Sequence, residues 1–148
     1  MKLDSNGIKF IHNEEGLRLE AYLCPAGVWT IGYGNTYHLD NTPVKKDDKI
    51  TLEQAKDLFD KKIKLYEDAV NKNVKVPLKQ NQFNALVSFC YNVGTLAFST
   101  STLLKKINSQ ASLDEIFVEF KKWVHAAKKI ITVLVNRRNR EIKLYQNV

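Results

Sequence analysis

The sequence lacks the features that mark several common protein classes. It has 2 cysteines among 148 residues, too few for a disulfide framework, and it has no low-complexity tract. No apolar run approaches the roughly 18 residues of a membrane span, and residues 1–7 lack the apolar segment of a secretory signal. We therefore expect a chain made in the cytosol with Cys24 and Cys90 free, a Cys24–Cys90 disulfide being the alternative.

Metal and nucleotide motifs are also missing. The histidines, His12, His38 and His125, show no paired metal-ligand spacing, and Gly32-Tyr33-Gly34 is too short for a nucleotide-binding loop. We therefore expect no metal and no cofactor.

Positive charge is confined to one end of the sequence. Residues 1–120 carry 15 basic and 15 acidic side chains, whereas residues 121–148 carry eight basic side chains and one acid, so the net charge of +7 belongs to the last segment. Such a segment attracts polyanions in general. Cell-wall murein with its carboxylates, nucleic acid and an anionic membrane all remain open on charge alone.

The patterns that are present predict an α+β fold in a single domain over residues 1–148. With 44% hydrophobic residues the chain can bury a core. A capping box at Thr51 and Gln54 begins a long amphipathic helix that reaches about residue 72. Further helices are expected over about 79–93, 100–108, 113–124 and 134–146, and strand signals occur only before residue 40. A small N-terminal β-hairpin lobe, a long joining helix and a larger helical C-terminal lobe are thus expected.

Residues 15–36 form the most informative segment. Asp4 and Ser5 can cap a helix that Gly16 ends, which places Glu15 at the negative end of that helix. This position disfavours the ionised carboxyl, so Glu15 is suited to keep a proton as a general acid must.

A hairpin is expected directly after this helix. Residues 25–27 form its turn and Val28–Tyr33 its second strand. Alternation along that strand places Thr30 on the face that can meet Glu15, with small glycines leaving room for a ligand. Glu15, Cys24 and Thr30 therefore form a candidate polar cluster.

At these residues the chain resembles the phage-type lysozymes, the endolysins of glycoside hydrolase family 24. The family pattern is a Glu, eight residues, an Asp or Cys, five residues and a Thr, which Glu15, Cys24 and Thr30 match. Residues 82–94 resemble the central helix of the family and residues 134–138 its closing helix. The resemblance implies a lysozyme-like fold and a monomeric muramidase that cleaves the β-1,4 bond between N-acetylmuramic acid and N-acetylglucosamine in peptidoglycan, with no cofactor.

The resemblance also implies roles for individual residues. Glu15 is expected to be the general acid of an inverting hydrolysis, with Thr30 orienting the water. Cys24 stands where Asp is commoner, and its role as base, nucleophile or polariser stays open, because an unperturbed thiol is mostly protonated at neutral pH. The residues expected to bind substrate are Tyr33, Thr36, Tyr91, Arg137 and Arg138, either arginine also being able to pair with Glu15. The alternative places both arginines in a solvated basic surface.

One segment departs from the family pattern. Family members commonly carry Gly-Gly and then Pro-Gly-Leu before the double arginine, where this chain has Ala127-Lys128 and then Thr132-Val133-Leu134. Losing permissive glycines predicts a more helical or differently docked segment.

Other functions stay open beside hydrolysis. They are lytic transglycosylase-like cleavage by a lone acid, a catalytically inactive murein- or polyanion-binding domain, and a nucleic-acid-binding helical domain, for which no recognition motif is found. For an endolysin without a signal sequence we expect accumulation in the host cytoplasm and holin-dependent release, followed by action on the cell wall in the periplasm.

Overall fold

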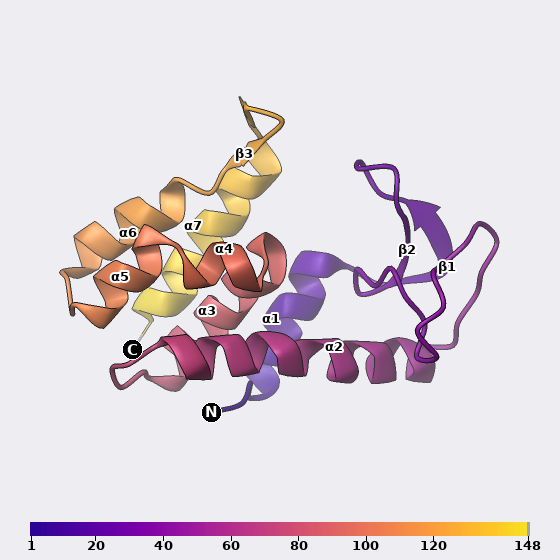
Figure 1. The fold of residues 1–148 in the computed structure, drawn as a ribbon, viewed down its shortest axis with the longest axis horizontal. Helices are drawn as coiled ribbons and strands as arrows, with labels where there is room; N and C mark the ends of the chain where they lie inside the picture. The colour runs from indigo at the N-terminus through magenta and orange to yellow at the C-terminus, as the bar shows by residue number, and fades with distance from the viewer. Residues whose placement is uncertain (148) are drawn as a thin grey trace. The chain divides into compact units, whose positions relative to one another are not determined.

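The computed structural model describes residues 1–147, which fall into two compact units along the chain. One unit is Lys9–Lys64, and the other is Met1–Ile8 together with the chain from Leu65 onward. Two helices, α1 (Ser5–Glu15) and α2 (Leu52–Asn73), each contribute residues to both units. The order of elements can be followed in Figure 1.

The smaller unit, Lys9–Lys64, contains an antiparallel hairpin. Strand β1 (Arg18–Leu23) pairs with β2 (Trp29–Gly32), so that Tyr22 lies opposite Thr30. A small core of Ile31, Val44 and Leu58 joins β2, the following loop and α2. The hairpin expected from the β-branched and aromatic run after residue 27 is confirmed.

The larger unit is helical and is built around α3 (Gln80–Val93), which is buried from Phe83 to Tyr91. It continues through α4 (Thr95–Ser99), α5 (Thr102–Asn108), α6 (Leu113–Lys121) and α7 (Thr132–Gln146). Helix α3 packs most extensively against α7. The core combines aliphatic side chains with the fully buried Phe83, Phe89, Phe98 and Phe120.

Several local signals in the sequence are confirmed. Gly16 follows the last residue of α1 with φ +69°, and Asp4 Oδ1 accepts a hydrogen bond from the backbone N–H of Gly7 at 2.9 Å. Thr51 and Gln54 exchange both hydrogen bonds of a capping box, at 2.9 and 3.1 Å. Cys90 is a fully buried core residue, and Cys24 and Cys90 are both free thiols.

The expectation of strands only before residue 40 is wrong. A second hairpin pairs β3 (His125–Ala126) with β4 (Lys129–Ile130), and α6 ends at Lys121 rather than near residue 124. Between these strands Ala127 and Lys128 adopt φ of +50° and +66°. The segment that lacks the family glycines therefore has two parts: Ala127 and Lys128 form the turn of a tight hairpin, whereas residues 132–134 are helical and begin α7 earlier than the expected residue 134.

Among the described residues, none of the helices is both long and apolar enough to cross a membrane.

Candidate functional site

The structure brings two of the three predicted catalytic residues together. Cys24 follows β1 at the start of the hairpin turn, and Thr30 lies in β2 and is only 4% exposed. The turn is closed by hydrogen bonds from Cys24 N–H to the Val28 carbonyl at 3.0 Å and from Gly27 N–H to the Cys24 carbonyl at 2.8 Å. The Thr30 hydroxyl donates to the Val28 carbonyl at 2.9 Å.

The Cys24 sulfur lies among hydrogen-bond donors of this turn. The backbone N–H of Val28 has the largest effect and lowers the pKa of the Cys24 thiol. The Ala26 N–H and the Thr30 hydroxyl lower it further, while partial desolvation opposes them. Donors of this kind stabilise a thiolate, so the turn favours the form of Cys24 that can act as a base or a nucleophile.

Glu15 is the last residue of α1, and its half-buried carboxylate lies against Gly34, just beyond β2. A Cβ placed on Gly34 would stand 3.2 Å from Glu15 Oε2, and Gly34 has φ +84°. Glycine is thus required there both by the backbone conformation and by the close approach of the carboxylate. The local structure places the predicted acid beside the turn that follows Thr30.

The side chains expected to bind sugar from this unit differ in exposure. Tyr33 is 6% exposed, and its ring stacks on His12 with centroids 3.9 Å apart and planes 9° apart. Phe59 meets both rings edge-on. Thr36 is half-buried, and its carbonyl accepts a hydrogen bond from Val44 N–H at 3.0 Å.

In the larger unit, the two predicted arginines are buried. Arg137 and Arg138 are 5% and 0% exposed and flank the fully buried Glu141. Arg137 Nε lies 3.3 Å from Glu141 Oε2, and Ser88 Oγ donates to the same oxygen at 2.6 Å. Arg138 Nε lies 3.1 Å from Glu141 Oε1, an ion pair without hydrogen-bond geometry.

Contacts beyond Glu141 fix both arginines. Arg137 Nη2 donates to the Ser88 carbonyl at 3.1 Å, whereas Arg138 donates to Asn92 Oδ1 and lies over the Phe89 ring. Burial raises the pKa of Glu141, and the two guanidinium groups oppose that rise. The alternative in which these arginines belong to a solvated basic surface is therefore wrong.

Tyr91, the remaining predicted binding residue, lies near the end of α3. It is 7% exposed, and its ring centroid is 4.9 Å from that of Tyr66.

Sequence reasoning missed two residues near the predicted site. Lys62 of α2 donates from Nζ to the Gly34 carbonyl at 2.9 Å and is half-buried, with Glu15 acting on it electrostatically. His12 stacks on Tyr33, and burial lowers its pKa. Helical periodicity places Lys62 on the same face of α2 as Phe59 and Ile63, which the sequence shows. Nothing in the sequence indicates which group Lys62 contacts.

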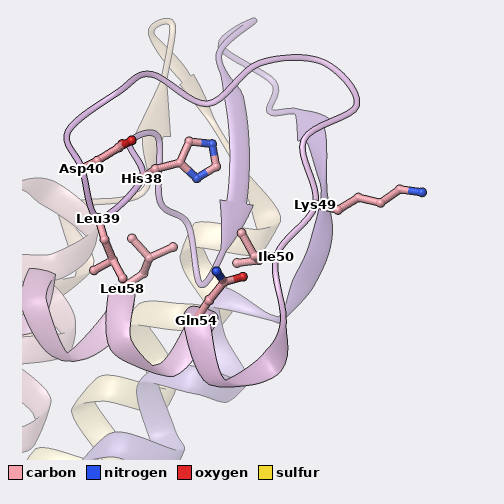
Figure 2. Close-up of a pocket in the computed structure, with 7 residues that line it drawn as sticks. All are labelled: His38, Leu39, Asp40, Lys49, Ile50, Gln54 and Leu58. Carbon is pink, nitrogen blue, oxygen red and sulfur yellow. The ribbon is translucent and has the colours of Figure 1, made fainter.

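A separate hollow of about 320 Å³ opens in the smaller unit and contains none of the predicted site residues. Figure 2 shows Ile50, Leu58 and Gln54 on one side and His38 and Asp40 on the other, with Lys49 extending away. Among the described residues, no cluster of His, Cys, Asp and Glu could hold a metal ion.

Comparison with known proteins gives a consistent result. The family model for phage lysozyme matches residues 12–141. The endolysin of Acyrthosiphon pisum secondary endosymbiont phage 1 is 39% identical over 151 residues, covering 99% of each sequence. The endolysin from Escherichia coli O157:H7 phage FAHEc1 has a TM-score of 0.91 at 38% identity, covering 99% of this chain and 94% of that one. The muramidase domain of SpmX from Asticaccaulis excentricus has a TM-score of 0.86 at 32% identity, covering 99% of both. The expected α+β, lysozyme-like fold class is confirmed.

Proposed function

Because the chain belongs to the phage lysozyme family and is a lysozyme-type enzyme, we propose that it hydrolyses the β-1,4 bond between N-acetylmuramic acid and N-acetylglucosamine in peptidoglycan. The observation that carries the proposal is the arrangement of Glu15, Cys24 and Thr30 around one hairpin, with Glu15 against Gly34 and the Thr30 hydroxyl of β2 beside the Cys24 thiol. The similar chain described as a muramidase domain supports the same bond specificity.

In this mechanism Glu15 is the general acid. Its proton passes to the glycosidic oxygen as the bond to the anomeric carbon breaks, which leaves Glu15 as a carboxylate. The Thr30 hydroxyl orients a water on the opposite face of the sugar. That water attacks the anomeric carbon and gives its proton to the Cys24 thiolate, so the configuration inverts. The donors that lower the pKa of Cys24 support its use as the base.

Substrate binding is proposed for Tyr33, Thr36, Tyr91, Arg137 and Arg138, as the family resemblance implies. Both arginines are buried, pair with Glu141 of their own helix, and donate to α3, Arg137 to Ser88 and Arg138 to Asn92. Their proposed contribution is therefore chiefly to hold α7 against α3.

The biological setting is proposed from the same family. The protein acts as a monomeric endolysin that accumulates in the host cytoplasm, depends on a holin for release, and then degrades the cell wall. Export without a holin would contradict this part of the proposal.

The first experiment is a digestion of purified murein followed by mass spectrometry of the new chain ends. Wild type should form reducing N-acetylmuramic acid ends. Glu15→Gln should slow their release by at least about 100-fold, because general acid catalysis contributes on that order. Glu14→Gln, the neighbouring helix-end acid, is the matched control and should stay close to wild type.

Other outcomes assign other functions. Anhydro ends would identify a transglycosylase, and no new ends would leave a murein-binding protein. The anomeric configuration of the first product, followed by nuclear magnetic resonance, tests the role of Cys24. Retention would show that the sulfur attacks as a nucleophile instead of serving as a base.

A further inference from the structure

Lys62 differs from the lysines beside it on α2. Lys61 and Lys64 are exposed, whereas Lys62 is half-buried on the side of the helix that carries the buried Phe59 and Ile63. Removing a charged ammonium group from water costs free energy unless polar groups of the protein replace the lost water. In Lys62 the first such group is the Gly34 carbonyl, which accepts a hydrogen bond from Nζ at 2.9 Å.

The same glycine contacts the proposed acid. Glu15 Oε2 approaches Gly34 so closely that a Cβ there would stand 3.2 Å away. Gly34 is therefore held between the ammonium of Lys62, at its carbonyl, and the carboxylate of Glu15, at its Cα. Burial lowers the pKa of Lys62, and the negative charge of Glu15 raises it, so the cation and the carboxylate interact across this short turn.

We propose that Lys62 is a positioning residue for Glu15, a role that rests on the proposed function of Glu15 as the general acid. Its ammonium fixes the Gly34 turn against which the carboxylate lies and supplies a positive charge beside it. Three elements meet in this arrangement: the end of α1, the turn after β2 and the middle of α2.

The arrangement matters most once the proton has left. Glu15 then carries a full negative charge. A neighbouring cation stabilises this carboxylate more strongly in a partly desolvated site than it would in bulk water, because less solvent screens the attraction. A fixed turn also limits the positions that the carboxyl can adopt. Misplacement of a catalytic group by about 1 Å can reduce the rate by about 100-fold. Lys62 should thus influence turnover more than substrate affinity.

The test compares Lys62→Met, Lys62→Arg and Lys61→Met for kcat and KM on solubilised murein chains. Lys61 is the matched control, because it also donates to loop oxygens, Leu39 O at 3.1 Å and Asn41 Oδ1 at 3.2 Å, but is exposed. Lys62→Met should lower kcat by about 10- to 100-fold with KM within about twofold of wild type. Lys62→Arg should recover most of kcat, and Lys61→Met should retain it.

Thermal unfolding of each variant separates a catalytic loss from a folding loss. If Lys62→Met turns over like wild type, or if its loss of rate matches a loss of folded protein, or if Lys62→Arg fails to recover kcat, the positioning role is wrong. Glu15→Gln assayed beside them tests the underlying function. An active Glu15→Gln enzyme refutes the acid assignment itself, whereas an inactive one with fully active Lys62→Met refutes only the role of Lys62.

Discussion

At the scale of single residues, the two cysteines have opposite environments. Cys24 is half-buried in a turn where the Val28 N–H, above all, lowers its pKa. Cys90 is fully buried in α3, and desolvation raises its pKa to about 12. The sequence predicted that both thiols are free and offered Cys24 as a catalytic candidate, but it did not predict how their pKa values differ. Their difference arises from the backbone donors around Cys24, which only the folded turn provides.

This contrast predicts selective alkylation of the native chain. Iodoacetamide should label Cys24 more than about 100-fold faster than Cys90 at pH 8, because only a thiolate reacts and each pKa unit is a factor of ten. The rate at Cys24 should rise with pH through a midpoint lower than that of the unfolded chain. Peptide mapping by mass spectrometry measures both sites.

The unfolded chain in urea, where both cysteines should react, is the reference for that experiment, and native Cys24→Ser should take up almost no label. Labelling of native Cys90, or a midpoint for Cys24 at or above that of the unfolded chain, would contradict the environments described.

Individual residues of the candidate site differ in whether the sequence could predict them. The spacing of Glu15, Cys24 and Thr30 was readable because all three belong to one continuous segment. Lys62 was not, since it lies 28 residues beyond its partner Gly34 and looks like any other lysine of a charged helix. Long-range partners of this kind depend on how the hairpin and α2 pack together, which no local pattern encodes.

At the scale of elements, periodicity and caps predicted most helices to within a few residues. The sequence did not predict α4. Helix α5 begins at Thr102, two residues later than expected, because the Ser101 hydroxyl accepts a hydrogen bond from Leu104 N–H at the N-cap. The hairpin of β3 and β4 was missed because Ala127 and Lys128 are poor turn residues. Left-handed backbone at such residues is unfavourable, so residue propensity gave no turn signal at these two positions.

That turn is a site for stabilisation. Replacing Ala127→Asn and Lys128→Gly together should raise the free energy of unfolding by about 1 to 2 kcal/mol, because asparagine and glycine adopt positive φ with less strain. Urea unfolding measures the change. Ala126→Gly, in the adjacent strand, is the control and should lower stability by about 0.5 to 1 kcal/mol. A double variant no more stable than wild type would show that φ at these positions carries no strain.

At the scale of the whole molecule, the excess of positive charge is divided between two settings. Arg137 and Arg138 are buried around Glu141, whereas the other basic side chains after residue 120 are exposed. From composition alone, all eight basic side chains after residue 120 belong to one positively charged segment. Burial distinguishes the two arginines from the remaining basic side chains. Only the exposed side chains can attract an anionic polymer such as murein. They are Lys121, Lys122, Lys128, Lys129, Arg140 and Lys143.

The pH dependence of stability is also a property of the whole chain, and His12 controls part of it. Burial lowers the pKa of His12 below its ordinary value near 6.5, while the carboxylate of Asp60 raises it to a lesser extent. Above about pH 6.5 the imidazole is neutral in both the folded and unfolded chains and contributes no pH dependence. As the pH falls below that value, the unfolded chain binds a proton that the folded chain does not, so the folded state loses stability until His12 is protonated there too.

Wild type should therefore lose stability on acidification from pH 6.5 with a slope of up to about 1.4 kcal/mol per pH unit from this one group. His12→Phe, which keeps a ring between Tyr33 and Phe59, should show a flatter profile over the same interval. The measurement is the free energy of urea unfolding at several pH values between 5 and 8 for both proteins, with His125→Phe, an exposed histidine, as the control. Because other titrating groups are shared, the difference between the His12→Phe and wild-type curves isolates His12, and parallel curves would show that its burial has no energetic consequence.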